Sequence, residues 1–352
     1  MPVNSVLPYD GLQITPQINL ARSTTWRMWL VSICAFLPII QSSLTDSYNS
    51  LLVAICTVAA AVLAELLILN KRKRVRMLKD GSAVATALIL TLLLPNRISP
   101  AYSAAGAIFA IAVVKHSFGG LGSNWLNPAA GGWLFIRFSW PVQFRNALSD
   151  SPLSSLGENY IMPGLNAALM ALESASSGLD SSLRLFLNRT VFSLIRSELP
   201  EGYLDLFASR FSGIIADRGL FALLLGTIII SATQVNRAWI PALYLVIFGV
   251  LVRFAGALPY DGGFWKGDIL YTICTGGVLA AAFLLASDPA TTAKSNKGII
   301  LATTASAALA FFFRCFGGEP YGAILAVLII NSILPLVRAL ERWRFYDKQE
   351  AA

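Results

Sequence analysis

The sequence predicts an all-α polytopic membrane protein, with about ten transmembrane helices in two inverted five-helix repeats and a long extracytoplasmic loop. The first supporting observation is composition, because 56% of the 352 residues are hydrophobic, only 13% are charged and the mean hydropathy is +0.64. Soluble domains carry about 25% charged residues, so this chain lacks the polar residues to cover a water-facing surface. The second observation is that its apolar runs are continuous, which favours helical membrane spans.

The third observation is that short motifs recur in the same order in the two halves of the chain. They are Asp80-Gly81 followed by Phe118-Gly119-Gly120 in the first half, and Gly267-Asp268 followed by Phe316-Gly317-Gly318 in the second. A duplicated membrane unit is typical of transporter-like and channel-like cores. The repeat therefore predicts two related halves that pack against each other.

Ten apolar segments are predicted to cross the membrane, five in each half. They cover residues 28–45, 51–69, 82–95, 101–114, 129–141, 219–234, 239–254, 269–286, 298–313 and 323–337. A helix needs about 20 residues to span a bilayer, and several of these segments are shorter. We expect 82–95 and 129–141 to be the broken or partly re-entrant ones, because transporters keep discontinuous helices at their sites.

Basic residues predict the orientation of these spans. Segment 71–79 contains six basic residues, and short loops rich in Lys and Arg stay in the cytoplasm. That assignment places both termini inside and inverts the two halves relative to each other. The predicted regions are a cytoplasmic segment 1–27, a first repeat 28–141, an extracytoplasmic loop 142–218, a second repeat 219–337 and a cytoplasmic tail 338–352.

Four acidic residues in or beside the spans are candidates for an ion path, because ionisable groups at membrane depth are costly and usually functional. They are Glu65, Asp80, Asp268 and Asp288. Each also has a structural interpretation. Asp80 and Asp268 stand where a carboxylate stabilises a helix N-terminus. Asp288 precedes a proline in a predicted turn, and Glu65 could pair with the basic segment 71–79.

The remaining polar features argue against two other classes of function. The four cysteines show no CxxC spacing and His116 is the single histidine, so we predict no metal or iron–sulfur site. The net charge of +8 is concentrated in short loops, where it orients the spans. It predicts the lipid bilayer as a partner, and no nucleic acid.

Several motifs, taken in order, resemble the RnfD proteins of the Rnf electron-transport complex. In the first half they are Asp80-Gly81-Ser82-Ala83, Phe118-Gly119-Gly120-Leu121-Gly122 and Asn127-Pro128-Ala129. In the second half they are Gly267-Asp268, Thr275-Gly276-Gly277, Ala286-Ser287-Asp288-Pro289-Ala290-Thr291, Phe316-Gly317-Gly318 and the stretch 331–335. The resemblance covers about residues 14 to 340. The related NqrB proteins of the sodium-pumping NADH:quinone reductase share these motifs.

This resemblance implies a membrane subunit of a redox-driven ion translocase of the ferredoxin:NAD oxidoreductase type, located in a bacterial cytoplasmic (inner) membrane. Rnf complexes move electrons between ferredoxin and NAD and couple this flow to transport of Na⁺ or H⁺. Their RnfD component holds an FMN through its phosphate on a threonine of the extracytoplasmic loop. A second, non-covalent flavin, riboflavin or FMN, is expected within the membrane part. The chain would pass electrons between the other subunits of the complex and would be inactive alone.

The residue that fits the FMN attachment position by distance is Thr190, in the stretch Leu187-Asn188-Arg189-Thr190. The family's stretch reads Ser/Thr-Gly-Ala-Thr, so Asn188 and Arg189 replace two small residues that give a flavin transferase access to the hydroxyl. This difference keeps two alternatives open. One is a non-redox transporter or channel that retains the inverted-repeat core, and the other is a structural subunit of the complex without covalent flavin.

Overall fold

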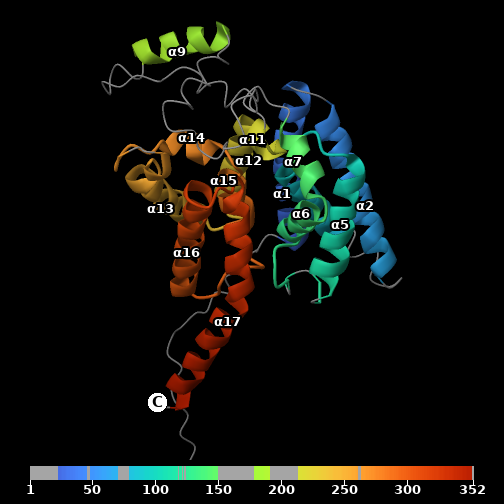
Figure 1. The fold of residues 1–352 in the computed structure, drawn as a ribbon. Coiled ribbons are helices and arrows are strands. Elements are labelled where there is room, and N and C mark those ends of the chain that lie inside the picture. The colour runs from blue at the N-terminus through green and yellow to red at the C-terminus, as the bar shows by residue number, and fades with distance from the viewer. Residues whose placement is uncertain are drawn as a thin grey trace, which may run out of the picture.

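The first half of the chain is a series of helices with short connections (Figure 1). The computed structural model describes residues 23–45, 48–69, 79–117, 119–120, 122, 124–149, 178–190, 213–260 and 263–350. The helices of the first half are α1 (Thr24–Thr45), α2 (Asn49–Ile68), α4 (Ser82–Leu93), α5 (Pro100–Phe109), the π-helix η1 (Ala110–His116), α6 (Pro128–Ser139) and α7 (Pro141–Ser149). One further helix, α9 (Gly178–Thr190), lies in the predicted extracytoplasmic loop.

The second half is also built of helices. Its helices are α11 (Ile215–Arg218), α12 (Leu220–Ala232), α13 (Trp239–Ala255), the 3₁₀ turn η4 (Leu258–Tyr260), α14 (Ile269–Cys274), α15 (Val278–Ala280), the π-helix η5 (Ala281–Ala286), α16 (Asn296–Cys315) and α17 (Gly322–Glu350). Helices therefore occupy all ten segments that the sequence predicts to span the membrane.

Three of the described helices are long and apolar enough to cross a membrane by length and composition, namely α1, α2 and α16. Helices α4, α12, α13 and the first part of α17 are shorter apolar helices. Large apolar side chains point outward, among them Leu44 and Leu67, which are 77% and 81% exposed. Because such residues are stable against lipid and not against water, the chain is a helical, multi-pass membrane protein. The exact number of crossings and the inverted repeats stay predictions.

Several helices begin where side-chain oxygens satisfy their first N–H groups. Asn127 accepts from Ala129 N and Ala130 N at the start of α6, where Pro128 occupies the first turn. Ser295 accepts from Gly298 N at the start of α16. These are the residue types preferred at helix N-termini, so the local sequence explains where α6 and α16 start.

The structure places a helix break in a segment that the sequence does not single out, and the prediction that 82–95 and 129–141 are partly re-entrant is not tested. Segments 82–95 and 129–141 contain continuous helices, α4 and α6, of 12 residues each. The break lies instead in segment 269–286, between α14 and α15. Gly276 and Gly277 there have φ values of +64° and +69°, a conformation that costs little for glycine and interrupts a right-handed helix. A π-helix, η5, follows the break and ends the segment.

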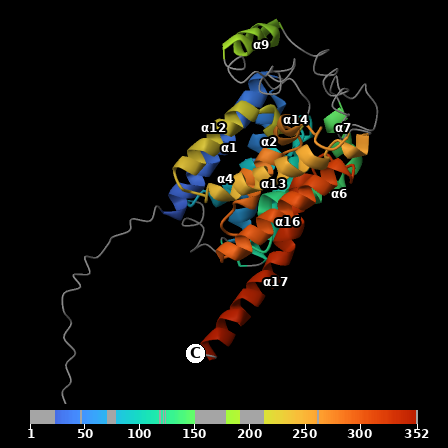
Figure 2. The ribbon, with the colours of Figure 1, turned by 90° about the vertical axis from the view of Figure 1, so that its left-hand side faces the viewer.

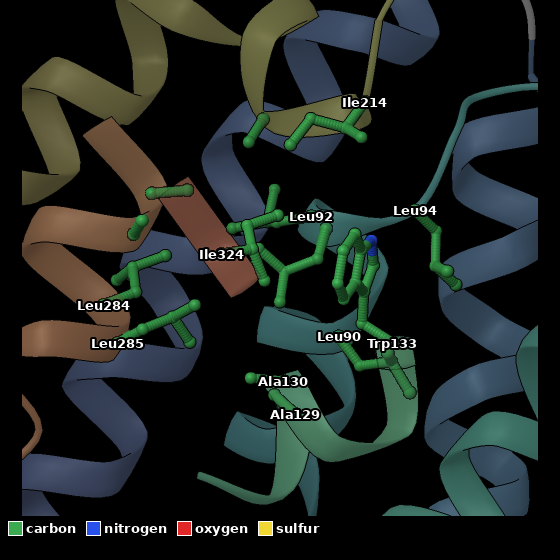
Figure 3. Packing of buried hydrophobic residues seen from close by; sticks show 14 of the residues in the cluster. Leu90, Leu92, Leu94, Ala129, Ala130, Trp133, Ile214, Leu284, Leu285 and Ile324 are labelled. Atoms are coloured by element: carbon green, nitrogen blue, oxygen red, sulfur yellow. The ribbon is translucent and has the colours of Figure 1, made fainter. Parts of the chain in front are cut away.

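The two halves share one hydrophobic core. Helix α1 packs against α12, α2 packs against α5, and α13 packs against α16. Figure 3 shows core side chains from the first half (Leu90, Leu92, Ala129, Ala130 and Trp133) together with side chains from the second half (Leu284, Leu285 and Ile324). In Figures 1 and 2, α9 lies beyond one end of this bundle and α17 extends beyond the other end. The shared core means that residues far apart in sequence can form common polar sites.

Candidate functional site

A polar site joins the two halves where α6 begins and η5 ends. We call it the inter-half site and define it as Asn124, Asn127, Asp288 and Asn331. Asn127 Nδ2 donates to Asp288 Oδ2 at 3.1 Å, although 161 positions separate the two residues. Asp288 Oδ1 accepts from Ala290 N at 3.0 Å, so the predicted turn before the proline is confirmed. Asp288 is therefore both a turn residue and a contact to the first half.

Two buried amides of the inter-half site have polar atoms without a partner. Asn124 is 6% exposed and Asn331 is 4% exposed. Asn124 Oδ1 and Asn331 Nδ2 have no hydrogen-bond partner among the described residues. Their segments meet, because Trp125 Nε1 donates to Ser332 O at 3.1 Å. Buried polar atoms without partners are costly, so this arrangement is suited to a ligand that offers both donors and acceptors.

The end of η5 is held next to this site. Asn236, in the connection between α12 and α13, donates from Nδ2 to Phe283 O at 3.2 Å and to Ser287 Oγ at 2.9 Å. A π-helix leaves backbone carbonyls in positions that an α-helix does not provide, and such bulges are frequent at functional sites. The amide of Asn236 uses one of these carbonyls and thereby places Asp288.

A second polar site lies within the first half, between α2, α4 and η1. Glu65 and Lys115 are 0% and 1% exposed, and Lys115 Nζ lies 2.7 Å from Glu65 Oε1. Lys115 Nζ also donates to Ser82 Oγ at 2.7 Å. Glu65 is thus paired with Lys115, and its pairing with the basic segment 71–79 stays a prediction. Residues 71–78 lie outside the described part of the chain.

One carboxylate oxygen of Glu65 takes no part in the buried ion pair. Glu65 Oε2 has no hydrogen-bond partner among the described residues. His116 Nε2 lies 3.5 Å from Glu65 Oε1, and its side chain is 11% exposed. A buried carboxylate with a free oxygen, a fixed cation and a histidine closer to the surface is an arrangement that can bind a proton or a small cation.

The other two acidic candidates are helix N-terminal residues. Asp80 accepts from Ser82 N at 3.0 Å, immediately before α4. Asp268 accepts from Tyr271 N at 3.0 Å at the start of α14. The structural interpretation of both is therefore confirmed, and their roles in an ion path stay predictions. Asp80 is connected to Glu65 through Ser82 and Lys115, whereas Asp268 belongs to the second half.

Thr190 is the last residue of α9 and is exposed. Its Oγ1 donates to Phe186 O at 2.7 Å, one helical turn earlier. The residue is accessible from outside, which an attachment site requires. Its hydroxyl donates to the backbone and is flanked by Asn188 and Arg189, which are bulkier than the small residues of the family's stretch.

Comparison with known proteins shows the family. Residues 12–347 match the model of the NQR2, RnfD, RnfE family. The chain belongs to this family. It is similar to a component of the proton-translocating ferredoxin:NAD(+) oxidoreductase complex from Clostridium ljungdahlii, with 28% identity over 92% of this chain and 92% of that protein. It is also similar to a component of the ion-translocating oxidoreductase complex from Vibrio cholerae, with 28% identity over 94% of this chain and 97% of that protein.

Several residues of these sites were not predicted from the sequence to be site residues. Asn124 carries no local signal, because isolated asparagines are common in loops, and Asn331 is known from the sequence only as the first residue of the motif 331–335. Arg137 lies within the predicted span 129–141 and forms an ion pair with Glu319, which precedes α17. Its guanidinium also lies 5.3 Å from the centre of the Trp133 ring. Helix α6 therefore contacts the second half at both ends.

Proposed function

We propose that this chain is the membrane subunit of an ion-translocating oxidoreductase complex of the Rnf type, in which it carries flavin and passes electrons between partner subunits. The observation that carries the proposal is the match to the family model over residues 12–347, which includes both halves and the connecting loop. In a bacterial cytoplasmic membrane, both termini would lie in the cytoplasm and the loop outside. The transported ion would be Na⁺ or H⁺.

The inter-half site supports a non-covalent flavin, riboflavin or FMN. An isoalloxazine ring presents donors and acceptors along one edge, which amide side chains can satisfy. Asn124 Oδ1 and Asn331 Nδ2 are buried and without partners among the described residues, and offer one acceptor and one donor. Asn127 and Asp288 would hold the two halves together beside these amides through their own bond. Flavin would supply the one- and two-electron redox chemistry, and the chain would supply placement and exclusion of water.

Thr190 is the residue proposed to hold a covalent FMN. The exposed end of α9 supports access by a transferase, and Arg189 is close enough in sequence to pair with a phosphate. The presence of Asn188 and Arg189 in place of two small residues favours the alternative in which this subunit has no covalent flavin. Denaturation distinguishes a subunit with covalent FMN from one without it, because covalent flavin stays with the denatured chain and non-covalent flavin is released.

The buried Glu65–Lys115 pair supports a path for ions through the first half. The path would open on the cytoplasmic side, where the basic segment 71–79 is predicted to lie. Glu65, Asp80, Asp268 and Asp288 stay the proposed ion-path residues, and Glu65 has the strongest physical basis. Its carboxylate is fully buried and has one unpartnered oxygen among the described residues, so protonation or binding of a cation there would relieve an electrostatic cost.

The test uses the complete complex purified from its membrane. Fluorescence of the denatured chain under ultraviolet light is expected for wild type and is expected to be absent in Thr190→Ala. Flavin released by denaturation is expected from wild type and is expected to fall in Asn124→Leu and Asn331→Leu. Ser43→Ala, which removes a hydroxyl from α1 and leaves both flavin sites unchanged, is the control. A complex that transfers electrons but contains no flavin in this chain would refute the electron-carrier part of the proposal.

A further inference from the structure

The break between α14 and α15 leaves backbone carbonyl groups without helical partners, and a buried arginine donates hydrogen bonds to them. Arg314, in the last turn of α16, is 3% exposed. Its Nη1 donates to Thr272 O at 2.5 Å and to Thr275 O at 2.9 Å, and its Nη2 donates to Thr275 Oγ1 at 3.1 Å. A Cβ on Gly276 would lie 2.7 Å from Arg314 Cζ, so only glycine leaves space for the guanidinium. The cation caps the negative end of α14.

A carboxylate occupies the other side of the same break. Asp217 belongs to the short helix α11, which ends the predicted extracytoplasmic loop and precedes the membrane helix α12. Its Oδ1 accepts from Gly277 N at 2.9 Å, at the point where α15 begins. The broken helix thus has a cation at its carbonyl side and a carboxylate at its N–H side. Nothing in the flavin site or in the Glu65–Lys115 pair uses these two charges.

Ionisable groups of α14, of α16 and of the segment before α17 face Asp217. They interact with it electrostatically and are Tyr271 and Cys274 of α14, Arg314 of α16, and Tyr321, which precedes α17. Arg314 is the single cation in this group, and Asp268 of α14 adds a second carboxylate nearby. Arg218, the next residue of α11, is a further buried cation, and a proton on Asp217 would change the local balance of acidic and basic groups.

Asp217 lies in α11, just before the predicted span 219–234, and its side chain is partly buried. Removal from solvent raises the pKa of Asp217 to about 7, although the Gly277 N–H and the Arg314 guanidinium pull it down. Carboxyl groups with such shifts, held beside a specific cation, are frequent at functional sites.

We propose that Asp217 binds and releases one proton at the break between α14 and α15, as a station for ion movement at the extracytoplasmic end of the second half. Uptake forms one O–H bond on the carboxylate, with a proton supplied by water, and raises the local charge by one unit. The carbonyl oxygen of the protonated group still accepts from Gly277 N, so the break keeps its shape in both states. The part played in transport rests on the proposed function, whereas the proton binding itself does not.

The experiment measures the carboxyl group directly. The full-length chain is placed in lipid nanodiscs, and infrared difference spectra are recorded while the pH is stepped through neutrality. Wild type is expected to show the carbonyl stretch of a protonated carboxyl group, lost with a midpoint near 7. Asp217→Asn should lack this band. Asp80→Asn is the matched control, because Asp80 likewise accepts one backbone N–H at the start of a helix, and it should keep the band.

A second variant tests the role of the neighbouring cation, Arg314. This test remains valid if Asp217→Asn does not fold. Arg314→Gln should raise the midpoint by about one pH unit or more, because an opposite charge at short range holds a carboxyl pKa down. A neutral-range band that survives in Asp217→Asn, or a midpoint that Arg314→Gln leaves unchanged, would overturn the inference and leave Asp217 as a structural cap. The spectra need no flavin, so absence of flavin would count only against the proposed function.

Discussion

The buried ion pair between Glu65 and Lys115 leads to a sharp prediction about stability. Lys115→Met removes the cation, keeps a side chain of similar length and leaves Glu65 buried without its partner. At 2.7 Å and an effective dielectric constant of about 20, the attraction lost is about 6 kcal/mol. Because desolvation of both ions offsets part of that attraction, removal of one partner of a buried pair costs about 3–5 kcal/mol.

The variant should therefore unfold at a lower temperature. A cost of about 3–5 kcal/mol corresponds to a fall in Tm of about 6–10 °C for a large domain. Cys34, Cys274 and Cys315 are buried free thiols, so a thiol-reactive dye that fluoresces on labelling reports their exposure during unfolding. Lys266→Met, the same substitution at an exposed lysine, is the matched control and should leave the Tm nearly unchanged.

The double variant Glu65→Gln with Lys115→Met separates the charge effect from loss of packing. It removes both buried charges, and replacement of a buried pair by neutral groups is often close to neutral in stability. The double variant should regain most of the lost Tm. If it is as unstable as Lys115→Met, or if Lys115→Met alone matches wild type, the two residues do not form the coupled pair described above.

Three further predictions use the same dye assay. Gly277→Ala should lower the Tm more than Gly122→Ala does. Both glycines have positive φ, but a Cβ at Gly277 would lie 2.9 Å from a side-chain atom, whereas a Cβ at Gly122 would have no atom within 4 Å. Equal falls in Tm would contradict the close packing at Gly277. Asn127→Ala should cost about 1–2 kcal/mol, since two N–H groups of α6 lose their acceptor, and an unchanged Tm would count against this cap. Burial raises the pKa of Asp217 from 3.8 to about 7, so between these two pH values the folded protein holds a proton that the unfolded chain has released. The free energy of unfolding should therefore fall as the pH rises from 3.8 to about 7. Its dependence on pH should be weaker in Asp217→Asn.

The sequence predicts the helices of this protein well, because their signals are local. Long apolar runs, N-terminal carboxylates and small residues before helices act within a few positions of the residue they affect. Asp80 and Asp268 accordingly serve as helix N-terminal acceptors, as their positions predict. The location of the broken helix was harder to predict. Short length pointed to α4 and α6, whereas the left-handed conformation of Gly276 and Gly277 is what interrupts the backbone.

Pairings between distant residues depend on how the helices pack. Glu65 lies near a basic segment in sequence, yet its partner is Lys115, 50 positions away, because α2 and η1 come together. Asn127 and Asp288 meet only because the two halves share a core. Composition and local chemistry thus establish a multi-helix membrane protein and its helix ends. Which polar groups face each other is settled by packing, because a buried charge or amide must find its partner wherever the fold brings one within about 3 Å.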